Sequence, residues 1–260
     1  MRESLGEAVC DRLDIFDLPD DFRLSVVVPV YNEATTVCRV VDRLIATGLP
    51  LEIILVDDGS DDHSAAQLSR IRASCRQSED ASHVEIRCIV HEQNLGKGAA
   101  IRSGVTASGG DVVVVQDADM EYDPADFRAM LRPLIEGHAD VVYGTRYGGP
   151  DRLASPWWHT QVNRGLSTFA SIAIGPRLTD VETCYKMARG DAFRAAVAAC
   201  RERRFGIEIE LTARFARQRL RFAEKPIRYQ HRWYGEGKKI GWRDGVSAIW
   251  CIVWYGLLRR

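Results

Sequence analysis

The feature that most constrains the fold of this chain is a run of four valines followed by two closely spaced aspartates. Val112–Val115 is β-branched throughout, which is typical of a strand buried on both faces of a parallel sheet. Asp117 and Asp119 follow at the point where such a strand ends. In open α/β sheets, ligands bind outside the carboxyl ends of the strands. The run therefore predicts a parallel sheet and also the edge at which its site lies.

The chemistry of that edge follows from its carboxylates. Asp117, Asp119 and Glu121 are spaced two residues apart, and their charges repel one another unless a cation lies between them. Oxygen ligands of this kind suit Mg²⁺ or Mn²⁺, which can also bridge the phosphates of a nucleotide. The alternative is a loop whose acidic side chains simply face water, and Asp-x-Asp alone does not decide between the two.

Two further predicted strands end in polar turns. Glu52–Val56 runs into Asp57-Asp58-Gly59-Ser60, and Leu24–Val30 ends at Tyr31-Asn32-Glu33. Pro29 lacks an N–H, so we expect it near the end of its strand and outside a central ladder. Three strands that end in polar, mostly acidic turns predict one shared crevice.

Strand and helix signals alternate along the chain up to about residue 143. This order predicts an α/β fold with a largely parallel sheet and helices on both faces. Further strands are expected at 84–90 and 140–143, and helices at 98–107, 124–136, 162–174, 192–201 and 208–218. We expect residues 1–21 to form an acidic, loosely ordered leader that is not a signal peptide, 22–241 to form one domain, and 242–260 to form a C-terminal amphipathic or apolar helix.

Composition narrows the class of protein. A net charge of −1 gives no broad basic surface of the kind that binds nucleic acid. Apolar residues make up 46% and charged residues 27% of the chain, as in ordinary globular proteins. The seven cysteines are scattered without a C-x-x-C pair, which predicts reduced thiols in a cytoplasmic setting and argues against disulfides or a zinc site.

Five segments resemble, in their order and spacing, the family 2 glycosyltransferases of the GT-A fold. They are Val28-Pro29-Val30-Tyr31-Asn32-Glu33, Val56-Asp57-Asp58-Gly59-Ser60, Asn94-Leu95-Gly96-Lys97-Gly98, Asp117-Ala118-Asp119 and Thr179-Asp180-Val181-Glu182-Thr183-Cys184-Tyr185-Lys186. The resemblance covers roughly residues 22–240. Within the family, the chain is most similar to the polyprenyl-phosphate (dolichol-phosphate) mannose and glucose synthases. The resemblance implies the GT-A nucleotide-binding fold with a mostly parallel central sheet and a helical C-terminal part.

The resemblance also implies an activity: metal-dependent, inverting transfer of a hexose from a GDP- or UDP-linked donor to polyprenyl phosphate. The nucleotide-sugar-binding residues that it implies are Pro29, Tyr31, Glu33, Asp57, Asp58, Lys97, Asp117, Ala118 and Asp119. Asp119 and Glu121 are the expected ligands of Mg²⁺ or Mn²⁺. The synthases often have Gln where this chain has Glu121, which means either tighter divalent binding or a Glu121 that points away from the metal.

Two of these segments leave alternatives open. Asn94–Gly98 fits neither a Walker A loop nor a Rossmann fingerprint, so it is either a plain turn before a helix or a turn that brings Lys97 to the nucleotide. In the segment from Thr179 to Lys186, Asp180 and Glu182 are the candidate catalytic groups, able to orient or deprotonate an acceptor hydroxyl. The alternative there is a helix cap. An ionised lipid phosphate would need no base.

Basic residues provide candidates for binding an anionic acceptor. These are Arg146, Arg164, Arg232, Lys238 and Lys239, and the last two lie in Tyr234–Ile240, which resembles the family's glycine-lysine loop over donor and acceptor. Arginine forks bind phosphate oxygens in pairs, although most surface arginines are simply solvated.

The final apolar stretch, Val246–Leu258, would span about 20 Å as a helix, against about 30 Å for a bilayer core. We expect it to lie on a membrane surface, dock on the sheet or form a homodimer interface. The protein is accordingly expected in the cytoplasm, either free or peripheral on the inner face of the membrane.

Three other functions compete with lipid-linked transfer. A soluble family 2 glycosyltransferase acting on a saccharide or other hydroxyl acceptor would share every donor residue and would need a base. A sugar-nucleotide pyrophosphorylase should carry a glycine-rich basic loop after its first strand, where this chain has Tyr31-Asn32-Glu33. A non-enzymatic nucleotide-binding module leaves the segments 179–186 and 234–240 unexplained.

Overall fold

The architecture is a seven-stranded sheet with helices on both faces. A computed structural model of the chain describes residues 16–75, 83–148, 157–231 and 242–258. The strands are β1 (Leu24–Val30), β2 (Leu51–Asp57), β3 (Val84–Val90), β4 (Val112–Val115), β5 (Val141–Thr145), β6 (Lys186–Arg189) and β7 (Phe222–Pro226). Their order in the sheet is β3-β2-β1-β4-β6-β5-β7, and β6 alone runs antiparallel to its neighbours. The predicted, mostly parallel α/β sheet is confirmed.

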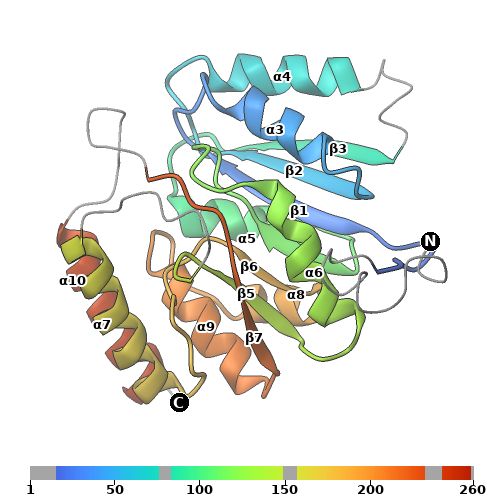
Figure 1. Cartoon of the computed structure of the whole chain (residues 1–260). Coiled ribbons are helices and arrows are strands. Elements are labelled where there is room, and N and C mark those ends of the chain that lie inside the picture. Colours follow the sequence, from blue (N-terminus) through green and yellow to red (C-terminus); the bar gives the residue numbers. More distant parts are fainter. Residues whose placement is uncertain (1–15, 76–82, 149–156, 232–241, 259–260) are drawn as a thin grey trace.

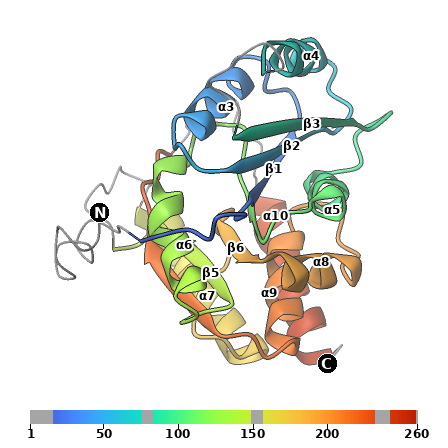
Figure 2. The ribbon, with the colours of Figure 1, turned by 90° about the vertical axis from the view of Figure 1, so that its right-hand side faces the viewer.

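Helices cover both faces of this sheet (Figures 1 and 2). They are α3 (Val37–Ile45), α4 (Ser64–Cys75), α5 (Lys97–Ala107), α6 (Phe127–Ile135), α7 (Trp157–Ile174), α8 (Gly190–Ala198), α9 (Ile207–Arg217) and α10 (Trp242–Ile252), with a short 3₁₀ turn η2 (Pro124–Asp126) and a π-helical end η4 (Val253–Leu258). Helices α5, α8 and α9 lie on one face, and α3, α4 and α6 lie on the other (Figure 2).

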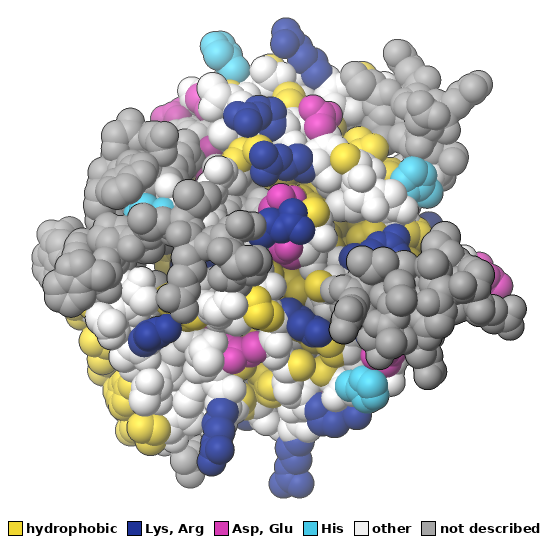
Figure 3. All heavy atoms as spheres, in the orientation of Figure 1, with side chains coloured by type: hydrophobic (Ala, Val, Ile, Leu, Met, Phe, Trp, Pro, Cys, Tyr) yellow, Lys and Arg dark blue, Asp and Glu magenta, His cyan; other side chains and the backbone are white. Residues whose placement is uncertain are grey.

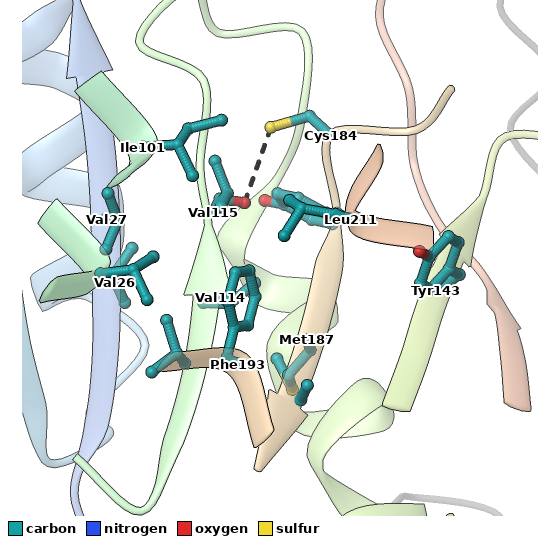
Figure 4. Packing of buried hydrophobic residues seen from close by; sticks show 14 of the residues in the cluster. Val26, Val27, Ile101, Val114, Val115, Tyr143, Cys184, Met187, Phe193 and Leu211 are labelled. Atoms are coloured by element: carbon teal, nitrogen blue, oxygen red, sulfur yellow. Dashed lines mark hydrogen bonds between the residues drawn. The ribbon is translucent and has the colours of Figure 1, made fainter. Parts of the chain in front are cut away.

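The valine run forms the central strand of the sheet. All four residues of β4 are buried, and the strand lies between β1 and β6. Ile101 of α5 and Phe193 of α8 pack beside Val114 and Val115 from one face of the sheet (Figure 4). Pro29 lies near the end of β1, as predicted, and beyond its ladder with β4, which stops at Val27. The expectation that it lies outside a central ladder is wrong for the other neighbour, because Pro29 is paired with Val56 of β2.

Two strands were missed by the sequence analysis, and one of them decides the position of the site. β6 pairs with β4 through Met187 opposite Val114, in the antiparallel sense. The segment 179–185 therefore reaches the carboxyl edge of β4, and Cys184 Sγ contacts the carbonyl oxygen of Val115 at 3.6 Å (Figure 4). The helix-cap alternative for Thr179–Lys186 is wrong because this segment leads into a strand.

The two ends of the chain both contribute to the core. Phe16, inside the expected leader, is buried in the hydrophobic cluster. The helix α10 and its extension η4 pack against α7 and α9, and they bury Ala248, Cys251, Ile252 and Tyr255. Their other side exposes Val246, Ile249, Trp250, Trp254, Leu257 and Leu258, and Figure 3 shows apolar side chains along the edge formed by α7 and α10. Among the described residues, no helix has both the length and the apolar content needed to cross a bilayer.

Candidate functional site

The turns that follow β1 and β2 are joined to each other by side-chain hydrogen bonds. Asn32 takes a left-handed conformation with φ of 55°, and its Oδ1 accepts from the Asp61 N–H at 3.0 Å. The N–H of Asn32 donates to Ser60 Oγ at 3.1 Å, and the N–H of Glu33 donates to Ser64 Oγ at 3.0 Å. The two polar turns predicted to share one crevice are therefore adjacent. Pro29 and Tyr31 lie half-buried at the same end of β1.

Asp58 supports the turn that carries Lys97. Its Oδ2 accepts from the Gly96 N–H at 2.7 Å, and its Oδ1 accepts from the Leu95 N–H at 3.0 Å and lies 2.7 Å from His91 Nδ1. Gly96 has a φ of 97°, a conformation that glycine adopts without strain. Asp57, which is also buried, accepts from the Ser60 N–H at 3.1 Å. Direct contact of either carboxylate with a nucleotide stays a prediction.

Lys97 reaches the end of β4. Its Nζ lies 2.8 Å from Asp117 Oδ1 and 3.1 Å from Oε1 of Glu208, which comes from α9. Burial acts against the charged ammonium, but the charges of Asp117 and Glu208 hold the pKa of Lys97 well above its usual value. The structure thus brings the ammonium of Lys97 to the predicted carboxylate cluster.

Asp119 has a strongly perturbed carboxyl group. Burial, with added repulsion from Asp117 and Glu121, raises the pKa of the Asp119 carboxyl to about 8. Its Oδ1 accepts from the Glu121 N–H at 3.1 Å. The Lys97 ammonium does not fully offset these negative charges, so a further positive charge nearby would stabilise the ionised form of Asp119. Ala118, between the two aspartates, is buried.

The described residues contain no preformed group of three or more His, Cys, Asp or Glu side chains arranged around one point for a metal ion. Mg²⁺ and Mn²⁺ bound with a nucleotide commonly use one or two carboxylates and take the remaining ligands from phosphate and water. Asp119 presents an oxygen ligand of that kind. Glu121 is partly engaged, since its Oε2 accepts from the Tyr229 hydroxyl at 2.8 Å.

Arg146 and Asp180 form a two-point ion pair beside this cluster. Nε and Nη2 of Arg146 each donate to a different Asp180 oxygen at 2.7 Å, and the Arg146 N–H donates to Asp180 Oδ2 at 3.0 Å. The Asp180 side chain has 0% exposure, and the Arg146 side chain retains 14%. Glu224 of β7 holds the turn by accepting from the Thr179 N–H at 2.8 Å. Both carboxylate oxygens of Asp180 are therefore hydrogen-bonded to Arg146.

Tyr229 connects the carboxylate cluster to this ion pair. Its hydroxyl donates to Glu121, and its ring centre lies 5.2 Å from the guanidinium carbon of Arg146, within cation–π range. The Gln230 N–H donates to the Glu121 carbonyl oxygen at 2.8 Å, and Tyr122 bridges to Tyr229 in the antiparallel sense. The strand-like continuation of β7 thus ties the two parts of the edge together.

The remaining predicted residues fall into three groups. Glu182 is half-buried near Arg146, and burial is the main cause of its raised pKa. Arg164 is exposed on α7, with its guanidinium 5.2 Å from the Tyr147 ring. Arg232, Lys238 and Lys239 lie outside the described residues.

Three residues in this region were missed by the sequence analysis: Glu208, Glu224 and Tyr229. Glu208 had a usable signal, because it stands between apolar residues in Ile207-Glu208-Ile209-Glu210-Leu211. Such a placement indicates a buried charge that requires a partner.

Comparison with known proteins identifies the family. A model of the family described as glycosyl transferase family 2 matches residues 25–196. The chain is 30% identical over 219 residues to the undecaprenyl-phosphate 4-deoxy-4-formamido-L-arabinose transferase of Edwardsiella ictaluri (strain 93-146), and 31% identical over 220 residues to the protein of the same name from Enterobacter sp. (strain 638). Each match covers 83% of this chain and 62% of the relative, so the chain spans less than two thirds of their length.

Solved structures match the fold at lower identity. Glucosyl-3-phosphoglycerate synthase from Mycobacterium tuberculosis, solved with Mn²⁺, uridine diphosphate and glucosyl-3-phosphoglycerate, has a TM-score of 0.60 at 19% identity, over 93% of this chain and 86% of its own. A mannosyltransferase from Pyrobaculum calidifontis, solved with GDP-Man and Mn²⁺, has a TM-score of 0.60 at 18% identity, over 91% and 66%. The chain belongs to glycosyl transferase family 2 and has the GT-A fold.

Proposed function

We propose that this enzyme transfers a sugar from a GDP- or UDP-linked donor to polyprenyl phosphate, with inversion at the anomeric carbon. The observation that carries the proposal is that one sheet edge holds a carboxylate cluster with Lys97 and, joined to it through Tyr229, an oriented arginine. The names of the undecaprenyl-phosphate transferases support the acceptor, and the nucleotides in the solved neighbours support the donor.

On the donor side, Asp119 would hold Mg²⁺ or Mn²⁺, with Glu121 as a second ligand. The ion would neutralise negative charge on the departing nucleoside diphosphate. Lys97 adds a positive charge at the same edge and is held there by Asp117. Pro29, Tyr31, Glu33, Asp57 and Asp58 would form the wall that receives the base and ribose, with Asp58 also fixing the Lys97 turn.

On the acceptor side, we assign Asp180 the task of orienting Arg146. A carboxylate that accepts two guanidinium N–H groups at 2.7 Å is poorly placed to take a proton from an acceptor. A lipid phosphate is already ionised near neutral pH, so the reaction would need no base. Arg146, with Arg164 and the basic residues Arg232, Lys238 and Lys239, would supply the charge that attracts the phosphate.

One observation keeps the saccharide-acceptor alternative in consideration. The pKa of Glu182 is raised, chiefly by burial, and a carboxylate with a raised pKa is a stronger base. If the acceptor were a hydroxyl group, Glu182 would be the base.

The exposed apolar side of α10 and η4 would bring the enzyme to the bilayer that holds a lipid acceptor. Trp250 and Trp254 stack with ring centres 5.7 Å apart on this side, and Ile249 and Leu258 are exposed beside them. Tryptophan and aliphatic residues on one helix side are typical of helices that lie in the membrane interface.

The first prediction tests transfer itself. With Mn²⁺, a short polyprenyl phosphate, and GDP-mannose or UDP-glucose as donor, we expect sugar transfer that EDTA abolishes. Asp119→Asn should lower turnover at least about a hundredfold, because it removes a proposed metal ligand. Asp111→Asn is the matched control, because Asp111 lies just before the other end of β4, where its side chain accepts from the Arg23 N–H. Radiolabelled product measures both. If Asp119→Asn kept near wild-type activity in the presence of EDTA, the metal assignment would be wrong.

The second prediction follows from the raised pKa of Asp119. The folded protein favours the protonated carboxyl, so this stabilisation is present below about pH 4 and is lost as the pH rises through about 8. Without divalent ions, Asp119→Asn should therefore unfold at a higher urea concentration than the wild type at pH 8.5, and by a smaller margin at pH 5. At pH 8.5, adding Mn²⁺ should raise the urea concentration at which the wild type unfolds but leave that of the variant unchanged. A margin that does not depend on pH would contradict the proposed cluster.

The third prediction concerns Arg146. Arg146→Lys removes the two-point fork, so the acceptor KM should rise about tenfold, the effect of one lost charge-assisted contact, while the donor KM stays within about twofold. Arg221→Lys provides the control, because Arg221 forms the same two-point pair with Asp140 at the opposite end of β5. Steady-state kinetics separate the outcomes. Equal changes in both KM values would indicate general damage, and no change would remove Arg146 from the acceptor site.

The fourth prediction concerns the membrane. The wild-type protein should co-sediment with vesicles of phosphatidylglycerol and phosphatidylcholine at low salt, and the double variant Ile249→Gln, Trp250→Gln should stay in the supernatant. Val90→Gln, which changes an exposed apolar residue on β3, serves as control and should sediment like the wild type. If no protein binds vesicles but the double variant loses a dimer in analytical ultracentrifugation, this side of α10 is a homodimer interface instead.

A further inference from the structure

Glu208 lies between two lysines in the interior of the enzyme. Its Oε2 accepts a hydrogen bond from Lys186 Nζ at 2.5 Å, and its Oε1 is 3.1 Å from Lys97 Nζ, an ion-pair contact without hydrogen-bond geometry. With Asp117 at the far side of Lys97, the four side chains form a row of alternating charge that starts at the end of β4 and ends in the core. Glu208 comes from α9, which the donor-site motifs do not include.

Stability does not explain this row. The Lys186 side chain has 0% exposure and that of Glu208 has 8%, so both charges have lost most of their water. The attraction within a buried ion pair often only offsets the cost of removing its charges from water, and apolar residues of similar volume would serve the fold as well. The effect of the row is therefore to be sought in the positions that it gives to its side chains.

The inner end of the row is fixed and the outer end faces the site. Lys186 Nζ also donates to the Thr183 carbonyl oxygen and lies 5.0 Å from the centre of the Tyr143 ring. These contacts hold Lys186 in place, and Lys186 holds one oxygen of Glu208. The other oxygen of Glu208 is then left to face Lys97, whose flexible four-carbon chain would otherwise take many positions.

We propose that Glu208 is a positioning residue for donor binding: it fixes the Lys97 ammonium beside Asp117, at the point where the diphosphate of the donor arrives. The proposal rests on the proposed nucleotide-sugar function. An ammonium fixed before binding loses less conformational freedom when the phosphates arrive. Glu208 acts through Lys97 and does not itself touch the donor in this assignment.

A direct electrostatic effect gives the opposite expectation. If Glu208 acted only through its charge, its removal would make the site more positive and a nucleoside diphosphate would bind more tightly. If Glu208 acts by holding Lys97, its removal weakens binding, and the effect disappears once Lys97 has been removed. A double-mutant cycle separates the two cases.

The experiment measures the Kd of UDP, and of GDP in a parallel series, by calorimetry with Mn²⁺ present. Glu208→Gln and Lys97→Met should each raise the Kd about tenfold, and the double variant should bind no more weakly than Lys97→Met alone. Glu52→Gln is the matched control, because Glu52 is a buried carboxylate paired with Arg87 at the opposite edge of the sheet. It should unfold at lower urea but leave the Kd within about twofold.

Two outcomes would overturn the proposal. One is that Glu208→Gln binds the nucleotide more tightly than the wild type or equally well. The other is that Glu208→Gln raises the Kd by the same factor in the wild-type and the Lys97→Met backgrounds. If Glu208→Gln does not fold, Glu208→Asp replaces it. This variant keeps a charge for Lys186 but is too short to reach both lysines, so the same rise in Kd is expected.

If the wild type binds neither UDP nor GDP, the proposed nucleotide-sugar function fails, and urea unfolding then decides the positioning claim. In that case, the midpoint shift of the double variant should be smaller than the sum of the two single shifts. Additive shifts would show that Glu208 does not hold Lys97.

Discussion

The antiparallel pairing of β6 with β4 is the constraint on which the site depends. Because β6 runs against β4, with Met187 opposite Val114, the residues that precede β6 lie at the carboxyl edge of β4. That edge already carries Asp117 and Asp119. A parallel β6 would have placed Asp180 and Glu182 at the opposite end of the sheet. One strand direction therefore joins the two halves of the site, which lie more than sixty residues apart in the chain.

Paired charges then hold each half in position. Lys97 lies between Asp117 and Glu208 at the end of β4, and Arg146 forms a two-point ion pair with Asp180. Such pairs contribute little net stability when buried, but they fix where each cation lies. Tyr229 contacts both halves, through Glu121 and through the face of its ring.

Much of the fold could be predicted, because several local patterns agreed. The valine run and the alternation of strand and helix signals indicated a largely parallel sheet, which is confirmed. β6 and β7 were missed because neither has a strand pattern: β6 is Lys-Met-Ala-Arg, and β7 contains Glu224 and Lys225. These strands form because they pair with β4 and β5, and that information is not local.

The amino-acid sequence by itself determined the fold class, the family and the edge at which the carboxylates gather. Periodicity, turn chemistry and motif order are properties of neighbouring residues, so they can be recognised in the sequence without knowledge of the fold. Only the tertiary structure decided what each charged group contacts. Asp180 was expected as a possible base and is committed to Arg146, while Glu208, far along the chain, reaches Lys97. The partner of a charge depends on distances across the folded chain, and those are set by strand order and direction.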